Sequence, residues 1–515
     1  MIVSSITSSI PRVVIPIFAG ACVAALSTAL ADRLPMMWVL LIIVGCAAFI
    51  PAIVAKDPLA YWLTLFLLAL PLNIWKRLGD VDRIVGVLRD TGALPGALPT
   101  PVLQLTDIPL LMMLIIWAVR MAIRKEGIHL SRAGLVPLAL LSLMTVTSFI
   151  APYPSVSFFE LYRQCKFFII FLFVSNNIDV KKFGKQIIVI LLLGLVLESS
   201  ITLVRYKFEW VGSLMGGTFG RVGESESASA YGMEEAAMDP EEAAEDVALN
   251  DPKAKRRGFG TFLHPNATAM YFELVLPFAL VLTLISPGIK KKTFYFVAFL
   301  IGVAGLFVTF SRGGMVGFLI SSMACIYIAY RRGFVPMAVL TGLISTALIV
   351  GAVVVPAYLT TRPEYFTARF DHLLAGIRVV LSHPIIGVGL NNSSLVRSLV
   401  APGGETEVER ALPIHSHYMI GLAEVGVLGF ALYVGFFIWI GVYALRLSTS
   451  PVFNTTVFGI AVIGAYCAIA THLLIDFLNN DAFHTLLWFY AGLIVAQTRT
   501  EQRESAAARV PQQSS

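Results

Sequence analysis

One apolar stretch constrains the fold of this chain more than any other feature. From Phe294 to Tyr330, about 37 residues carry a single charged side chain, that of Arg312. One continuous helix of that length would measure about 55 Å at about 1.5 Å per residue, whereas the hydrocarbon layer of a bilayer is about 30 Å thick. The stretch therefore predicts two membrane-spanning helices, with Arg312 at the turn between them.

Composition and further apolar runs predict an all-α polytopic membrane protein. Hydrophobic residues make up 57% of the 515 residues and charged residues only 14%, whereas soluble domains are about half apolar and about a quarter charged. Further runs of spanning length begin near Val13, Met36, Leu59, Asp107, Ala133, Phe158, Lys185, Ala267, Val335, Tyr418, Phe453 and Ala482. Together with the pair around Arg312, they predict about 12–14 transmembrane helices.

The distribution of basic residues predicts the orientation of these helices. Lysine and arginine cluster in every second loop, at residues 120–132, 181–185, 290–292, 331–332, 446 and 499–503. The alternate loops 151–157 and 476–481 contain neither residue type. Because cytoplasmic loops are enriched in basic residues, both termini are expected in the cytoplasm and Arg312 on the outer side, which is the periplasm for a bacterial inner membrane. The net charge of +6 reflects these flanks and gives no indication of nucleic-acid binding.

Two long loops, 205–262 and 357–417, are expected on the same outer side. In the first, ten acidic residues within 222–252 precede a basic run that ends at Arg257. This segment is either a solvated insertion or an acidic lid over a basic site. In the second, apolar residues recur at helical spacing over 366–381, which is typical of an amphipathic helix on the membrane surface or on the bundle.

Cysteines and histidines give little indication of a metal site. The five cysteines are scattered through apolar segments without paired spacing, so neither a disulfide framework nor a thiolate site is indicated; they are Cys22, Cys46, Cys165, Cys325 and Cys467. His415 and His417 could form a zinc pair with His372 or His383. No carboxylate or cysteine stands at dependable ligand spacing, so chemistry without a metal or other cofactor is expected.

Four sequence motifs resemble those of a known family and occur in the same order along the chain. They are "GFGTFLHPNATAMYF" (258–272), "FVTFSRGG" (307–314), "RFDHLLAGIRVVLSHPIIGVG" (369–389) and "HSHYMIGLAEVGVLG" (415–429). Over about residues 155–430 the chain resembles the O-antigen ligase and polymerase family of bacterial polysaccharide assembly. The resemblance implies a fold like that of C-type membrane glycosyltransferases (GT-C), without the need for a metal ion.

The resemblance also implies an organisation and an activity. Residues 151–444 would form the catalytic core, between N-terminal helices in 1–150 and C-terminal helices in 445–497, with a disordered cytoplasmic tail at 498–515. The implied reaction moves a glycan from an undecaprenyl-diphosphate carrier, at the periplasmic face of the inner membrane, to lipid A core (ligase) or to a growing carrier-linked glycan (polymerase). Membrane lipids and polysaccharide assembly proteins are the further partners that the resemblance suggests.

Individual residues are assigned through the same resemblance. It implies catalytic roles for Arg257, Arg312 and His415, and substrate binding by Asn266, Arg369, His417 and Glu424. Which of the two histidines faces the substrate stays open. The residue types suit the chemistry, because permanently charged guanidinium groups stabilise a departing diphosphate and a histidine accepts the proton of an acceptor hydroxyl.

Each assignment has a structural alternative. Arg312 at a helix end could extend to the lipid headgroups, and Arg257 could merely flank a membrane span. Two acids beside or within spans, Glu198 and Glu273, are expected to form local hydrogen-bonded pairs rather than to serve a cavity. At the level of function, a lipid-linked glycan flippase or secondary transporter and a structural partner in polysaccharide assembly remain the alternatives.

Overall fold

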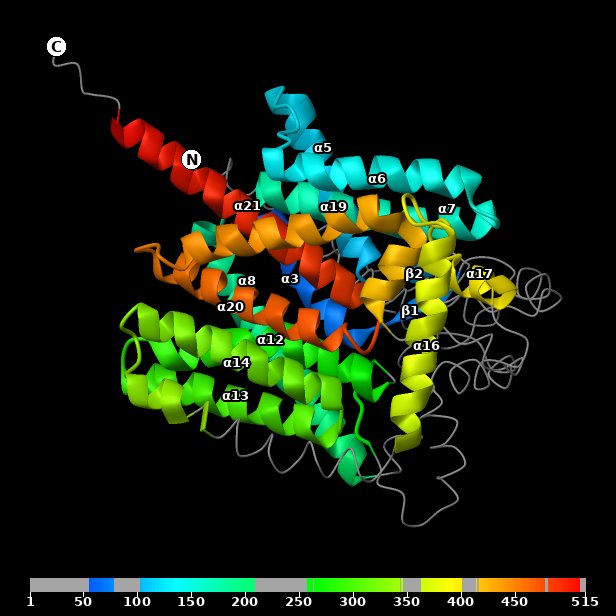
Figure 1. Cartoon of the computed structure of the whole chain (residues 1–515). Coiled ribbons are helices and arrows are strands. Elements are labelled where there is room, and N and C mark those ends of the chain that lie inside the picture. The colour runs from blue at the N-terminus through cyan, green and yellow to red at the C-terminus, as the bar shows by residue number, and fades with distance from the viewer. Residues whose placement is uncertain are drawn as a thin grey trace, which may run out of the picture.

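The computed structural model of the protein is dominated by helices (Figure 1). It describes residues 55–77, 102–208, 257–262, 264–342, 344–345, 363–400, 414, 416–477 and 480–509. The only strands in this described part are β1 (Trp75–Arg77) and β2 (Val102–Gln104), which pair as a short antiparallel ribbon with Trp75 opposite Gln104. The sequence patterns gave no indication of this ribbon.

The helices of the described part have defined bounds. In chain order they are α3 (Pro58–Ala69) with the 3-10 turn η1 (Leu70–Leu72), α5 (Asp107–Arg124), α6 (Arg132–Ile150), α7 (Pro154–Asn177), α8 (Val180–Lys207), α12 (Pro265–Ile285), α13 (Ile289–Val308), α14 (Arg312–Arg331), α16 (Pro363–Ser382), α17 (Ser393–Val400), α19 (His417–Leu447), α20 (Phe453–His472) and α21 (Asp481–Arg509). Several have a side chain that accepts a backbone N–H at the start, as Ser311 does for α14 and His264 for α12.

Seven of these helices are long and apolar enough to cross a membrane: α6, α8, α12, α13, α14, α19 and α20. The prediction of an all-α polytopic membrane protein is thereby confirmed. The expected split of residues 294–330 is also present, since α13 ends at Val308 and α14 begins at Arg312. The spans expected near Val13 and Met36, and most of the one near Val335, lie outside the described residues.

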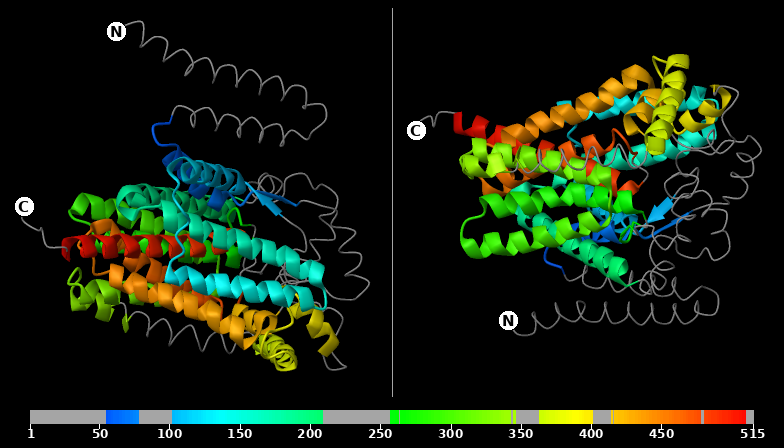
Figure 2. Two further views of the ribbon diagram at one scale, coloured as in Figure 1. Left: turned by 90° about the horizontal axis from the view of Figure 1, so that it is seen from above. Right: turned by 60° about the horizontal axis from the view of Figure 1, so that its bottom comes forward.

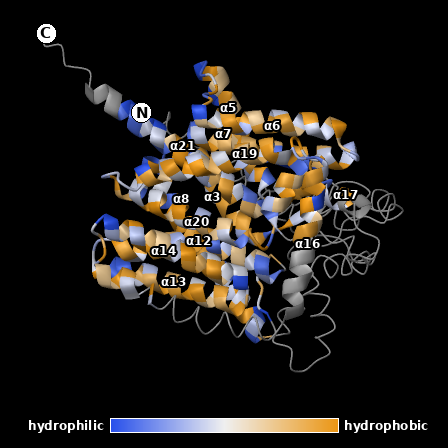
Figure 3. Ribbon diagram, in the orientation of Figure 1, coloured by the Kyte–Doolittle hydropathy of each residue, from blue (hydrophilic) through white to orange (hydrophobic). Residues whose placement is uncertain are grey.

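Helix α12 lies at the centre of the bundle. It packs against α8, α13, α14, α20 and α21, and nearly all of its residues are buried. Its sequence is apolar on every face, as expected for a helix surrounded by other helices. The peripheral α13, by contrast, exposes Phe294, Leu300 and Phe307. Hydrophobic residues extend along the helices, and hydrophilic residues gather towards their ends (Figure 3).

The helices have two distinct ends, which the views in Figures 1 and 2 show from several directions. Loops with the predicted cytoplasmic basic residues meet at one end, where Lys181 pairs with Glu504 at 2.5 Å and Arg332 donates to the carbonyl of Thr449. The α13–α14 turn, the start of α19, the α20–α21 turn and α16 lie at the other end. The residues predicted to act together therefore share one side of the bundle.

Helix α19 is broken near that end by Gly426, which has φ 64° and ψ −177°. Residues 384–389 run along the break and satisfy its backbone: Val427 N donates to Pro384 O (2.9 Å), and Gly389 N donates to Glu424 O (3.0 Å). A Cβ on Gly426 would lie 2.2 Å from Ile385 O, so this close approach requires glycine. Irregular backbone at a membrane span is stable only when its polar groups are paired in this way.

Candidate active site

Arg257 is held against the turn that carries Arg312. Its Nε donates to Thr309 O (3.1 Å) and its Nη2 to Asn266 Oδ1 (2.6 Å). Next to it, Gly258 N donates to Val308 O (2.6 Å). The segment that follows the acidic insertion therefore lies on the α13–α14 turn, three residues before Arg312. Arg257 is half-buried and Arg312 is exposed. An anion could therefore reach both guanidinium groups from solvent or lipid.

The α13–α14 turn presents Arg312 at the first position of a helix. Phe310 adopts a left-handed conformation (φ 49°), and Ser311 caps α14 by accepting the backbone N–H of Gly314 (3.3 Å). The first turn of a helix carries a partial positive charge, which adds to the charge of Arg312. Together with Arg257, this end of α14 forms a strongly cationic region.

A buried histidine supports the same turn from inside the bundle. His472 Nδ1 lies 2.8 Å from Glu273 Oε2, and its Nε2 lies 3.5 Å from Asp476 Oδ2. The imidazole packs directly against Gly313, where a Cβ would be only 2.4 Å from His472 Cδ2. Glycine at 313 thus lets the ring reach between α14 and the α20–α21 turn. The expected local pairing of Glu273 is confirmed, with His472 as its partner.

The start of α19 is fixed to the α20–α21 turn as well. The backbone N–H of His417 lies within hydrogen-bond distance of two carbonyls, Asp476 O (2.9 Å) and Leu473 O (3.2 Å). On either side of His415, Ile414 and Ser416 are buried. His415 itself lies outside the described residues. The turn at 473–476 thus connects the helix start that follows His415 with the histidine that supports the Arg312 turn.

Glu198 anchors the loop that carries Arg257. Its two carboxylate oxygens accept from Thr261 N and Thr261 Oγ1, both at 2.9 Å. About two turns further along α8, Arg205 Nη1 donates to Gly260 O (2.6 Å). The expected local pairing is confirmed for Glu198 also, since this buried acid binds backbone and hydroxyl groups. Its role is to hold residues 257–262 in place rather than to face a cavity.

A cavity of about 110 Å³ lies beside the start of α19, between α6, α7, α19, α21 and residues 390–394. Two residues predicted to bind substrate, His417 and Glu424, line it. Glu424 accepts from Ser393 Oγ (2.7 Å), and His417 Nε2 lies 3.5 Å from Tyr433 Oη. Helix α7 contributes Glu160, Arg163 and Gln164, which sequence reasoning did not select.

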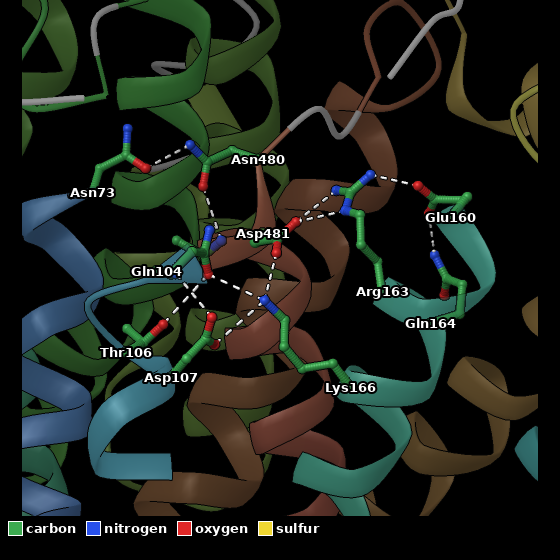
Figure 4. Close-up of polar contacts among 11 residues, drawn as sticks. Asn73, Gln104, Thr106, Asp107, Glu160, Arg163, Gln164, Lys166, Asn480 and Asp481 are labelled. Carbon is green, nitrogen blue, oxygen red and sulfur yellow. Dashed lines mark hydrogen bonds and ion pairs between the residues drawn. The ribbon is translucent and has the colours of Figure 1, made fainter. Parts of the chain in front are cut away.

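An ion cluster behind this cavity joins three helices (Figure 4). Asp481 accepts from Arg163 Nε (2.8 Å) and from Lys166 Nζ (2.6 Å), and Lys166 also lies 3.5 Å from Asp107. Arg163 Nη1 in turn lies 2.5 Å from Glu160 Oε2. Glu160, Arg163 and Lys166 stand at every third position of an otherwise apolar helix, and this spacing could have indicated a buried polar site. Their distant partner Asp481 could not be identified from spacing.

Two further residues were predicted to bind substrate, Asn266 and Arg369. Asn266 orients Arg257, as described above. Arg369 belongs to α16, which packs on α19, but its side chain lies outside the described residues. Among the residues described, no three histidine, cysteine, aspartate or glutamate side chains are grouped as metal ligands. The possible zinc partners His372 and His415 fall outside that search.

One comparison with known proteins found a matching family. Residues 297–434 match the family model described as O-antigen ligase. The match is about a quarter of the chain and extends from α13 through α14 and α16 to α19. No curated protein matches the chain. The matched segment contains Arg312, the α16 helix and the broken start of α19. Over residues 297–434, the chain is therefore similar to the O-antigen ligase family, which implies a glycosyltransferase-type membrane enzyme.

Proposed function

We propose that the protein transfers a glycan from an undecaprenyl-diphosphate carrier to lipid A core, as an O-antigen ligase, with carrier-linked glycan as the acceptor in the alternative polymerase reaction. The observation that carries this proposal is the shared support of Arg257, Arg312 and the start of α19. Arg257 bonds to the turn that precedes Arg312, through Thr309 O. His472 packs against Gly313, next to Arg312, and the carbonyls of Leu473 and Asp476 hold the start of α19.

The chemistry follows from the charges at this end of the bundle. The acceptor hydroxyl oxygen forms a bond to the anomeric carbon of the donor glycan while the bond from that carbon to the diphosphate oxygen breaks. Arg257 and Arg312 stabilise the negative charge that develops on the departing undecaprenyl diphosphate. His415 accepts the proton from the acceptor hydroxyl. Two guanidinium groups supply the charge that a divalent metal would otherwise provide.

The other predicted residues support these two tasks. Asn266 fixes the direction of the Arg257 guanidinium through the 2.6 Å bond to its Nη2. Arg369 on α16 contributes a further positive charge towards the carrier diphosphate. His417 and Glu424 contact the acceptor, since both line the cavity beside the start of α19.

The reaction is proposed to occur on the periplasmic face of the bacterial inner membrane. Basic loops gather at the opposite end of the bundle, and by the positive-inside rule this supports a cytoplasmic location for that end and, as proposed from the sequence, for both termini. A carrier lipid in the outer leaflet could then present its diphosphate to the end that bears Arg257 and Arg312.

A strain that lacks the gene tests the biological reaction. Loss of polymer from lipid A core, with long carrier-linked chains retained, is expected for a ligase. Single repeat units in place of long chains would indicate the polymerase. Accumulation of the lipid-linked glycan on the cytoplasmic side would indicate a flippase. Unchanged surface glycans would contradict the proposal.

The purified full-length protein tests the assigned residues. Arg312→Ala is expected to lower the transfer rate at least about 10²-fold, as removal of one charge-stabilising donor does in other enzymes. Arg331→Ala is the matched control, because it removes the same charge from the other end of the same helix. Equal activity of the two variants would show that Arg312 serves only to contact lipid headgroups.

A further inference from the structure

We infer that Asn73 and Asn480 are a positioning pair, which holds the loop 257–262 so that Arg257 faces the diphosphate of the donor. This inference rests on the proposed function, since it names residues that act through Arg257 in the same reaction. The two asparagines stand 407 positions apart in the sequence, and neither belongs to a motif that the sequence patterns indicated. Only the folded chain brings them together at the loop.

The two side-chain amides face each other (Figure 4) and form a chain of hydrogen bonds that ends on the loop. Asn480 Nδ2 donates to Asn73 Oδ1 (2.9 Å), and Asn73 Nδ2 donates to the carbonyl of Thr261 (3.4 Å). A carbonyl only accepts, so Asn73 must turn its NH2 group to Thr261 and its oxygen to Asn480. The 3.4 Å bond is at the long end of the range for an amide donor, so a small shift of either residue would break it.

The other end of this chain of hydrogen bonds is fixed by the start of α21. Asn480 Oδ1 accepts the backbone N–H of Ala482 (2.8 Å) and thereby caps the helix. The next residue, Asp481, pairs with Arg163 Nη2 of α7 at 2.7 Å. Asn480 therefore presents its NH2 group to Asn73 from a fixed position.

The segments that carry the two asparagines make further contacts with the end of the loop. Thr261 Oγ1 donates to the carbonyl of Pro71, two residues before Asn73. The ring of Phe262 packs on that of Phe483, with the ring centroids 5.1 Å apart. The start of α21 and the segment that ends at Asn73 thus contact both of the last two residues of the loop.

The position of Arg257, at the start of the loop, depends on these contacts. Arg257 lies four residues before Thr261, so about 14 Å of extended chain is the most that can separate them. Its guanidinium donates to Thr309 O (3.1 Å) and Asn266 Oδ1 (2.6 Å). A shift of about 1 Å away from these acceptors would break both bonds, and a misplacement of that size lowers a catalytic rate about 10²-fold. The pair would therefore act on the donor through Arg257.

Binding of undecaprenyl diphosphate, the carrier without its glycan, to the full-length protein in detergent tests this inference. Asn480→Ser keeps an oxygen that caps α21 but is too short to reach Asn73. Asn73→Gly removes the amide and keeps the left-handed backbone at φ 47°. Each substitution is expected to raise the Kd about tenfold, the effect of one lost hydrogen bond to a charged group. Asn177→Ser is the matched control, because Asn177 also donates to a carbonyl, that of Phe173 (3.0 Å), at the other end of the bundle.

Two further measurements separate positioning from a general loss of structure. The asparagine variants should raise the KM for donor, while the KM for acceptor and the thermal unfolding midpoint stay at the values of the control. Arg257→Ala keeps Arg312 and therefore measurable binding; in that background Asn480→Ser should leave the Kd unchanged, because the group through which it acts is missing. Native affinity in both asparagine variants, an equal rise in both KM values, or a tenfold rise of the Kd in the Arg257→Ala background would overturn the inference.

Failure of the proposed function gives a different result in the same samples. Native protein that binds no undecaprenyl diphosphate, or transfers no glycan, would overturn the proposed reaction and the inference with it. Native protein that binds the carrier and transfers glycan, together with asparagine variants that do both equally well, would overturn only the positioning role.

Discussion

Gly313→Ala is expected to reduce catalysis without unfolding the protein. The added Cβ would lie 2.4 Å from His472 Cδ2 and 2.7 Å from His472 Nε2, whereas ordinary contacts begin near 3.4 Å. About 1 Å of displacement must therefore be absorbed. The imidazole resists it, because it is buried and lies 2.8 Å from Glu273. Such overpacking costs about 1–3 kcal/mol.

If the first turn of α14 absorbs this displacement, Arg312 moves by about 1 Å, and a misplacement of that size lowers a catalytic rate about 10²-fold. The assay is glycan transfer by the purified variant, together with its thermal unfolding midpoint. Gly441→Ala is the control, because a Cβ there meets nothing within 4 Å. Gly313→Ala with native activity would refute the argument that the His472 contact positions Arg312. An equal loss in Gly441→Ala would show a general effect of alanine in the bundle.

Three further substitutions test other contacts. Arg257→Lys keeps the charge but cannot keep both hydrogen bonds; since one bond to a charged group contributes about 1.5–3 kcal/mol, the KM for donor should rise at least about tenfold. Asp481→Asn leaves two buried cations without their shared carboxylate and should destabilise the protein by about 3–5 kcal/mol, measured by thermal unfolding in detergent. Gly426→Ala places a Cβ against Ile385 O at a position with positive φ, so lower stability and a higher KM for acceptor are expected. Native stability and a native KM would contradict the argument that the break in α19 requires glycine.

Local features were predictable from the sequence because they depend on neighbouring residues. The length of the apolar stretch around Arg312 required a turn, and the structure has that turn at 309–311. The recurrence of apolar residues in 366–381 predicted a helix, and α16 spans Pro363–Ser382. That Glu198 and Glu273 are paired was expected because an isolated charge is costly at a membrane span, but their partners Thr261 and His472 are distant in the sequence and could not be named.

Contacts between distant segments were not predictable from a single sequence. Nothing in the spacing indicates that Asp481 pairs with Arg163 and Lys166, because those side chains meet only after α7 and α21 pack together. The support that His472 gives to the Arg312 turn depends in the same way on the packing of α14 against α20. The break in α19 was also unexpected, since Gly426 is one of several glycines in that span.

The 473–476 turn has a consequence for how such an enzyme can diversify. His472, at the start of this turn, supports the α14 end, and the carbonyls of Leu473 and Asp476 hold the start of α19. A substitution that adapts one side to a new glycan would also displace the other side. Changes of specificity should therefore arise as compensating pairs of substitutions across this turn, with strongly non-additive effects, rather than as independent single replacements.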